Sequence, residues 1–194
     1  VIENSLWEAV PDFLRELDGR LQEDYSVSLP LDASPVQFSS WMGGDRDGNP
    51  FVTSKVTEQV LLLARKRAAK LFALDLDRLQ VELSMYDCND ALREKVGDAN
   101  EPYRALLRPL LDRFIATRDG IASYLAGKNP DTSNWIESND ELLEALLLCH
   151  QSLIDCGMDV VAKGLLLDSI RRAHVFGIHL LRLDVRQDSE RHAD

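Results

Sequence analysis

The turn Asp45-Arg46-Asp47 places three charged side chains side by side and is a candidate ligand site. Gly43-Gly44 precedes the turn and Gly48 follows it, so the backbone there can adopt unusual angles and approach a ligand closely. Two known ligand-binding loop motifs do not match this turn. An EF-hand would need glycine at Pro50, and a Walker loop would need Lys-Ser or Lys-Thr after its glycines. On composition alone, a salt-bridged turn that starts the next helix is the simpler interpretation.

A second group of charged side chains lies near the end of the chain. Arg182, Asp184 and Arg186 alternate with apolar residues, which is the two-residue period of a strand. The charged face is either a solvated edge or the polar face of a barrel strand that meets a ligand cavity at its C-terminal end. Arg186 carries the guanidinium fork that holds a phosphate or carboxylate through two parallel hydrogen bonds.

The histidines and cysteines suggest no metal or nucleophile site. The four histidines lack HExxH spacing, and the three cysteines lack CxxC spacing. An odd number of cysteines in this arrangement also argues against a disulfide framework. We therefore expect no metal ligands in this sequence and a reducing, cytoplasmic location.

Composition and charge exclude several classes of protein. The 194 residues are 45% hydrophobic and 28% charged, which is close to the globular average. The formal net charge of -11 opposes broad attraction to nucleic acid or to an anionic membrane. The longest apolar runs are far shorter than the roughly 20 residues that span a bilayer. We expect no nucleic-acid or membrane partner.

Helical periodicity covers most of the chain that must position these side chains. Thr53 or Ser54 can cap a long helix, and Ser138 with Glu141 forms a capping box. The charged run at 65–67 is most simply a solvated helix face. The expected helices cover 6–21 with a bend or restart at Pro11, 54–74, 102–125, a segment following 138, and 163–176, which Gly177 closes.

Two short segments favour strands instead. The β-prone run from Val36 to Met42 ends at Gly43-Gly44, and the alternating run covers 181–186. No repeat and no long linker divides the chain, so we expect residues 1–194 to form one piece without an internal domain boundary. The predicted fold class is mainly α, with two short strands near Trp41 and Arg186.

Both candidate segments closely resemble signature motifs of the phosphoenolpyruvate carboxylases of bacteria and plants. The first reads Phe-Ser-Ser-Trp-Met-Gly-Gly-Asp-Arg-Asp-Gly-Asn-Pro at 38–50, and the second reads Leu-Asp-Val-Arg-Gln-Asp-Ser-Glu-Arg-His at 183–192. The family commonly has Glu where this sequence has Asp188. The resemblance covers essentially the whole chain and is closest to the gammaproteobacterial branch. Further short segments resemble the same family in the same order along the chain, at 3–8, 82–85, 101–104 and 152–157.

This resemblance implies an activity and two site residues. The family joins bicarbonate to phosphoenolpyruvate to give oxaloacetate and phosphate, with Mg²⁺ or Mn²⁺, on a mostly helical protein built around an α/β-barrel to which the two strands would belong. By resemblance, Arg186 contacts the substrate phosphate, and Trp41 lines the apolar pocket for the substrate's methylene group. Further candidates are Asp45, Arg46, Asp47 and Arg182.

The resemblance also implies what this sequence lacks. The family's catalytic histidine motif, metal-binding carboxylates and glycine-rich loop do not occur in it. Because Val1 is not Met and no signal peptide is visible, we expect an internal segment of a longer enzyme that is inactive alone. The parent enzyme is expected to be cytoplasmic, tetrameric and allosterically controlled. The alternative is a non-catalytic helical interaction domain derived from the same fold. The parent reading frame would distinguish the two, because only the enzyme requires the histidine motif and the glycine-rich loop.

Overall fold

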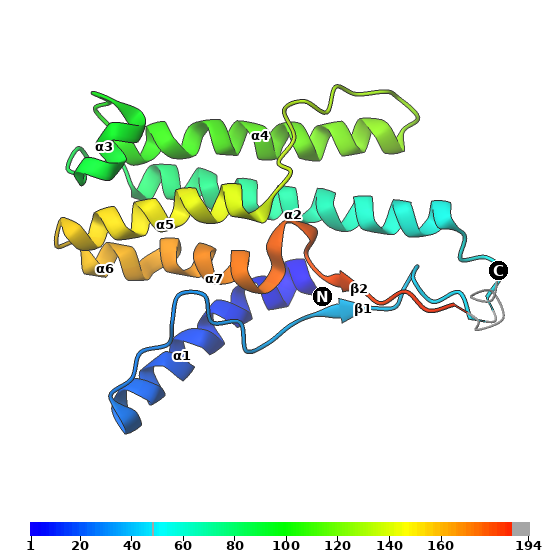
Figure 1. The fold of residues 1–194 in the computed structure, drawn as a ribbon, viewed down its shortest axis with the longest axis horizontal. Helices are drawn as coiled ribbons and strands as arrows, with labels where there is room; N and C mark the ends of the chain where they lie inside the picture. The colour runs from blue at the N-terminus through cyan, green and yellow to red at the C-terminus, as the bar shows by residue number, and fades with distance from the viewer. Residues whose placement is uncertain (48, 188–194) are drawn as a thin grey trace.

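The computed structural model describes residues 1–47 and 49–187, and it is mainly helical with one small parallel sheet (Figure 1). The predicted fold class is confirmed. The elements, in chain order, are η1 (Ile2–Leu6), α1 (Trp7–Tyr25), β1 (Ser39–Ser40), α2 (Ser54–Glu82), α3 (Asp90–Val96), α4 (Pro102–Leu125), α5 (Asn139–Asp155), α6 (Asp159–Val161), η2 (Ala162–Leu166), α7 (Leu167–Phe176), η3 (Gly177–His179) and β2 (Arg182–Leu183).

Local signals set most helix ends where the sequence predicts them. The Thr53 side chain accepts a hydrogen bond from the Val56 amide and caps α2. The capping box of Ser138 and Glu141 begins α5, and Pro102 occupies the first turn of α4. Gly177, at φ 56°, ends α7. The structure adds the short helix α3, which the sequence analysis did not predict.

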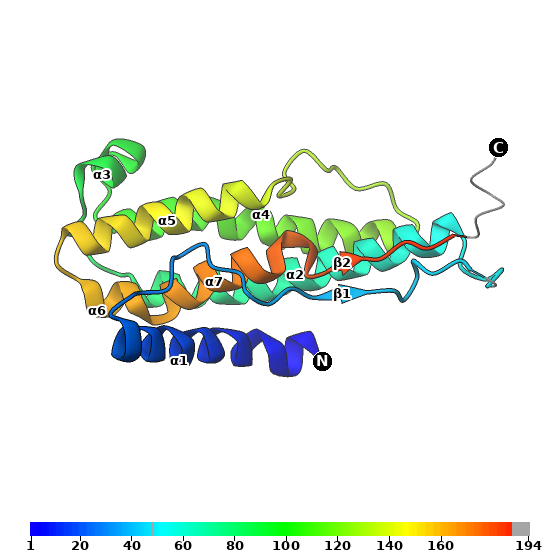
Figure 2. The same cartoon turned by 60° about the horizontal axis from the view of Figure 1, so that its bottom comes forward.

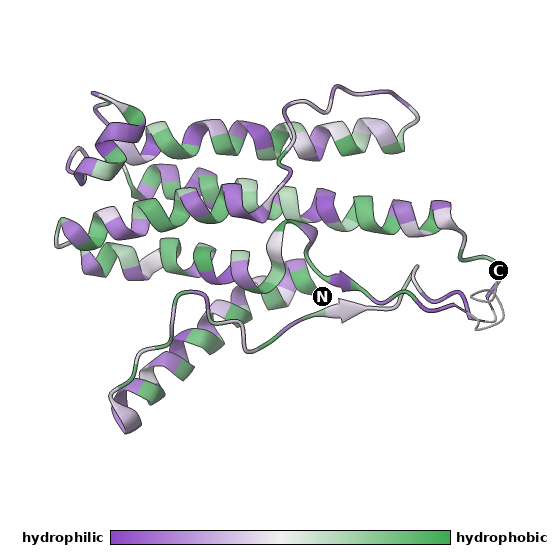
Figure 3. Ribbon diagram, in the orientation of Figure 1, coloured by the Kyte–Doolittle hydropathy of each residue, from purple (hydrophilic) through white to green (hydrophobic). Residues whose placement is uncertain are grey.

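The helices lie in three layers (Figure 2). The layer of α4 and α5 packs on the layer of α2 and α7, and α1 covers the opposite side of α7. Most of the buried apolar side chains form one cluster that extends from Trp7 to Leu180. Hydrophobic and hydrophilic residues accordingly alternate along the helices (Figure 3). Within the described residues, no helix is long and apolar enough to cross a membrane.

A buried ion pair links three of the helices. Arg172 on α7 and Asp75 on α2 are only 1% and 2% exposed, and their side chains lie 3.0 Å apart (Nη1 to Oδ2). The Trp7 indole also donates to Asp75 over 3.2 Å. Burial raises the pKa of Asp75, while the charge and hydrogen bond of Arg172 act in the opposite direction. The pair fixes α1 and α7 against α2.

Pro11 lies inside α1, which continues through it, so the helix does not restart at this position. Proline lacks an amide N–H, which leaves the carbonyl of Trp7, four residues earlier, without its helical donor. The Nε of Arg172 donates to that carbonyl over 2.7 Å. A side chain from α7 thus supplies the donor that proline removes, and α1 runs continuously from Trp7 to Tyr25.

The two strands pair in parallel although they lie far apart in the sequence (Figure 1). Ser39 pairs with Arg182 and Ser40 with Leu183. The chain enters β2 through a sharp turn in which Leu180 adopts a φ of 70°. Both strands are shorter than the runs predicted at 36–42 and 181–186, because a turn at Trp41 interrupts β1.

Candidate functional site

The two motif segments lie side by side at the C-terminal ends of β1 and β2. The Asp184 amide donates to the Ser40 carbonyl over 2.8 Å, which continues the ladder beyond the strands. The Arg186 amide donates to the Gly44 carbonyl over 3.0 Å, and the Arg46 amide donates back to the Arg186 carbonyl over 2.8 Å. The backbone therefore brings the turn after Trp41 and Arg186 to one end of the sheet, as parallel strands require.

Gly43 and Gly44 allow this close pairing. The amide of Gly44 donates to the Trp41 carbonyl over 3.0 Å and closes the turn. Gly43 has a φ of 83°, and a Cβ added to it would lie 2.5 Å from the Val60 side chain on α2. A Cβ on Gly44 would lie less than 3.0 Å from the carbonyl oxygen of Asp184. The two glycines thus let the turn contact α2 on one side and β2 on the other.

Arg46 faces the start of α2. Its Nη2 donates to the Thr57 hydroxyl over 3.0 Å, and that hydroxyl donates to the Gly43 carbonyl over 2.8 Å. Asp45 forms an isolated parallel bridge with Arg186, and its side chain accepts from the Asp47 amide over 3.1 Å. These contacts hold the turn against both α2 and β2. Gly48 lies outside the described residues.

Arg186 is exposed and has one open edge. The Asp184 carboxylate accepts from its Nε over 2.8 Å and lies 2.7 Å from its Nη2. The hydrogen bond to Asp184, followed by its negative charge, raises the pKa of the Arg186 guanidinium. Among the described residues Asp184 is its side-chain partner, and this contact uses only one edge of the fork. The Nη1–Nη2 edge can therefore bind a second anion in bidentate fashion.

Trp41 presents its indole to solvent at the same end of the sheet. Its relative exposure is 61%, and Met42, Val185 and Phe51, which follows the first segment, are also exposed. Large exposed apolar side chains in a cluster mark a region that contacts another group or another part of a protein. An indole at this position can shield a reacting group from water, and it can pack against a further segment of chain.

The comparisons with known proteins decide the family. The family model for phosphoenolpyruvate carboxylase matches residues 1–194. The chain belongs to this family. It is 57% identical over 194 residues to the phosphoenolpyruvate carboxylase of Pseudomonas putida GB-1. This alignment covers 100% of this chain and 22% of that protein. The enzyme of Tolumonas auensis is 53% identical over 192 residues, which covers 99% of this chain and 22% of that protein.

The predicted likeness to gammaproteobacterial phosphoenolpyruvate carboxylases is thereby confirmed. The chain spans about a fifth of the length of these relatives, 22% in both. Of the second motif, the residues from Asp188 onward lie outside the described part of the chain.

Phosphoenolpyruvate carboxylases use a divalent metal, and the described residues do not fit one. Within 1–47 and 49–187, no group of three or more His, Cys, Asp and Glu side chains could hold an ion. The Asp45 carboxylate instead accepts from a backbone amide within its own turn, and Asp184 is paired with Arg186. No metal-dependent step is assigned to this chain.

Arg182 lies apart from the turn that contains Arg46. Its side chain is exposed, and it lines a cavity at the other end of β2, with Phe38 and Arg65 also in the wall. Arg65 departs from the predicted solvated helix face, because it is half-buried, donates to the Ile136 carbonyl and lies 5.6 Å from the Trp135 ring centroid. Helical period alone could not reveal this, since Trp135 reaches Arg65 from an irregular loop.

Proposed function

We propose that this chain is part of a phosphoenolpyruvate carboxylase and supplies one side of its active site. The proposed reaction joins bicarbonate to phosphoenolpyruvate and gives oxaloacetate and inorganic phosphate. The observation that carries the proposal is the parallel pairing of the two motif segments, which brings Arg186 and the turn after Trp41 to one end of the sheet. Lyase activity and carbon dioxide fixation are the activities of the family as a whole.

Arg186 is proposed to hold the phosphate of the substrate. Asp184 holds the Nε–Nη2 edge of the guanidinium and orients it, and the Nη1–Nη2 edge can accept two phosphate oxygens. In the proposed reaction, a bicarbonate oxygen attacks phosphorus and the bond from phosphorus to the enol oxygen breaks. Carboxyphosphate and the enolate of pyruvate result. The guanidinium stays with the phosphoryl group throughout and can stabilise the charge that develops on it.

Trp41 is proposed to protect the enolate from water. Carboxyphosphate releases its carboxyl carbon to the enolate, which forms the new carbon–carbon bond of oxaloacetate and leaves inorganic phosphate. A proton from water would instead convert the enolate to pyruvate. The large, exposed indole next to the turn at Gly43-Gly44 offers an apolar wall that excludes water from this carbon.

Further features are carried over from the family as proposals. The catalytic histidine, the ligands for Mg²⁺ or Mn²⁺ and the glycine-rich loop are proposed to lie elsewhere in the parent chain. The strand pair is proposed to belong to an α/β-barrel, since a parallel sheet normally has both faces covered. Residues 1–194 are proposed to be one piece of that chain, without an internal domain boundary. Cytoplasmic location, a homotetramer and allosteric control complete the proposal.

The test compares the full-length protein from the parent reading frame with the 194-residue chain. Each is incubated with phosphoenolpyruvate, bicarbonate and Mg²⁺, and oxaloacetate and phosphate are measured separately. The proposal expects equal amounts of both products from the full-length protein and none from the chain alone. Product from the chain above a heat-killed control would overturn its proposed inactivity. A full-length protein without either product would favour the non-catalytic helical domain.

A further inference from the structure

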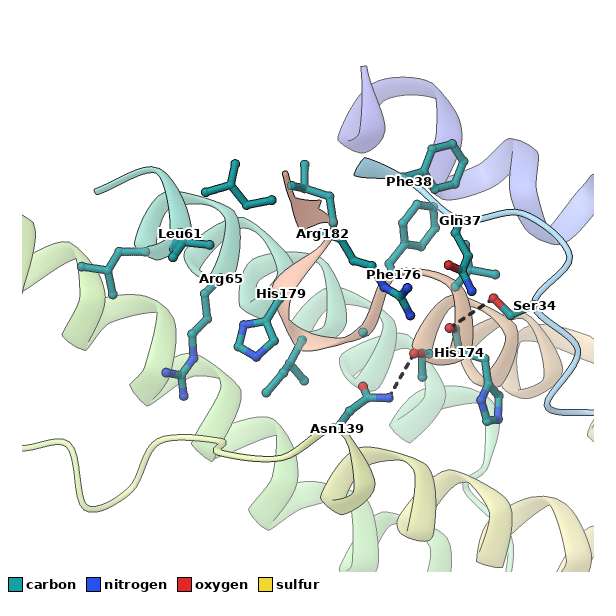
Figure 4. A pocket seen from close by; sticks show the side chains of 17 residues that line it. Ser34, Gln37, Phe38, Leu61, Arg65, Asn139, His174, Phe176, His179 and Arg182 are labelled. Atoms are coloured by element: carbon teal, nitrogen blue, oxygen red, sulfur yellow. Dashed lines mark hydrogen bonds between the residues drawn. The ribbon is translucent and has the colours of Figure 1, made fainter. Parts of the chain in front are cut away.

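A cavity of about 650 Å³ lies beside β2, between α2, η3 and the segment that precedes β1 (Figure 4). Its walls include Phe38, Leu61 and Phe176, together with polar side chains such as those of Ser34 and Gln37. Neither Trp41 nor Arg186 lines it. The volume is within the range of about 300 to 1,000 Å³ that is typical of sites for small organic ligands.

One wall of the cavity is aromatic. The rings of Phe38 and Phe176 stack with their centroids 5.3 Å apart and an angle of 13° between their planes. Leu61 contributes an exposed apolar side chain from α2. These surfaces favour a ligand with a flat or otherwise apolar body, because such a body removes the exposed apolar area from water.

The arginines in the lining of the cavity have no acidic residue beside them in that lining, although the chain as a whole carries a net charge of -11. Arg65 and Arg182 are among the residues that line it, and no Asp or Glu is. The Arg182 side chain makes no hydrogen bond or ion pair to any residue in the described ranges, and in Figure 4 its guanidinium points toward Phe176. A guanidinium group without a carboxylate partner, beside an apolar wall, can bind an anionic group.

Two further polar atoms at the cavity lack partners within the described residues. The Nε of Arg65 and the Oδ1 of Asn139 are both buried and make no hydrogen bond. Partial burial, followed by the charge of Arg65, lowers the pKa of His179, which lies beside Arg65 in Figure 4. Both atoms have almost no accessible surface, so neither faces the open part of the cavity, and the case for a ligand depends on Arg182 and the aromatic wall.

We propose that this cavity binds an organic anion, in which a carboxylate or phosphate group meets Arg182 and an apolar body rests on Phe38 and Phe176. The site is separate from the proposed phosphate position at Arg186. Arg182 and Arg186 are four residues apart on an extended segment, which corresponds to roughly 13 Å. One small substrate therefore cannot use both arginines through the same anionic group.

The test measures binding of 1-naphthylacetate, 1-naphthyl phosphate and neutral 1-naphthylacetamide to the full-length protein by calorimetry. At least one of the two anions should bind with one site per chain, and the acetamide should bind at least tenfold more weakly. The stronger of the two anions identifies whether the site prefers a carboxylate or a phosphate ester. Arg182→Gln should weaken anion binding by at least tenfold, and Arg182→Lys should weaken it less.

The control variant is Arg20→Gln, which removes an exposed arginine of α1 outside the cavity and should leave binding unchanged. Circular dichroism checks that each variant is folded. Equal binding of 1-naphthylacetate and 1-naphthylacetamide, or an unchanged affinity in folded Arg182→Gln, would overturn the proposal. So would the absence of binding at millimolar concentration, because the rest of the parent chain would then occupy the cavity.

Competition separates this proposal from the proposed carboxylase site. Phosphoenolpyruvate should not displace the bound naphthyl anion, and Arg186→Gln should leave its affinity unchanged. Displacement, or loss of binding in Arg186→Gln, would place the anion at the carboxylase site and overturn the separate cavity. If Arg186→Gln instead keeps full carboxylase activity while naphthyl binding persists, the proposed role of Arg186 fails and the cavity proposal stands.

Discussion

Replacing Gly44 by alanine tests whether the close pairing of the two motif segments matters for activity. The added Cβ would lie less than 3.0 Å from the carbonyl oxygen of Asp184 and 3.1 Å from its carbonyl carbon. Both are backbone atoms, so no side-chain rotation can relieve the contact. One strand must move away from the other by about 1 Å or more to restore ordinary van der Waals contact.

This movement acts where the ladder holds Arg186. The Arg186 amide donates to the Gly44 carbonyl over 3.0 Å, so a shift at residue 44 changes the position of the guanidinium directly. Overpacking of this kind costs about 1 to 3 kcal/mol of stability. A displacement of about 1 Å in a group that positions substrate can lower kcat/KM about 100-fold. We expect Gly44→Ala to reduce kcat/KM for phosphoenolpyruvate by roughly 10- to 100-fold in the full-length protein.

Gly19→Ala is the matched control for this experiment. Gly19 lies within α1, and a Cβ added there meets no atom within 4 Å. Alanine in a helix interior is favoured over glycine by about 1 kcal/mol, so this variant should be slightly more stable and as active as wild type. Steady-state kinetics and thermal unfolding are measured for both variants. Wild-type kcat/KM and Tm in Gly44→Ala would refute the importance of the strand pairing.

The remaining predictions concern the buried ion pair and three histidines of the 194-residue chain. Arg172→Met should lower the free energy of unfolding in urea by about 3 to 5 kcal/mol, because it leaves Asp75 buried without its partner. The double variant Arg172→Met/Asp75→Leu should lose less, and an equal or larger loss would contradict the ion-pair explanation. Burial lowers the pKa of three histidines, so the unfolded chain takes up protons more readily than the folded chain near pH 6.5. The free energy of unfolding should therefore be highest above pH 6.5 and should fall as the pH decreases through 6.5. A variant with all three histidines replaced by Gln should show a flatter dependence on pH. A flat profile in the wild type would contradict this prediction. The histidines are His150, His174 and His179.

The helices were predictable because their signals are local. A capping residue, a helical apolar period and a terminal glycine each act within a few residues, as at Thr53, Ser138 and Gly177. The short helix α3, Asp90–Val96, was missed since seven residues are too few to establish a helical period. The continuity of α1 through Pro11 depends on a donor from Arg172, which no local pattern can predict.

The site was only partly predictable, for a related physical reason. The alternating charges around Arg186 predicted a strand, but they left open whether the charged face was solvated or faced a ligand. Only the fold shows that this segment pairs with the turn after Trp41, since the partners are more than 100 residues apart in the sequence. The cavity at Arg182 is formed by four separate segments, and no spacing in the sequence reveals it.

Kinetics of Arg186→Lys in the full-length protein test the central proposal most directly. Lysine keeps the positive charge but cannot bind Asp184 through one edge and phosphate through the other. Arg20→Lys, on the exposed face of α1, is the control and should leave kcat/KM unchanged. If Arg186 holds the substrate phosphate, kcat/KM for phosphoenolpyruvate should fall by roughly 30- to 1,000-fold while circular dichroism stays unchanged. A change of less than about threefold would identify Arg186 as an exposed strand charge and contradict the proposal.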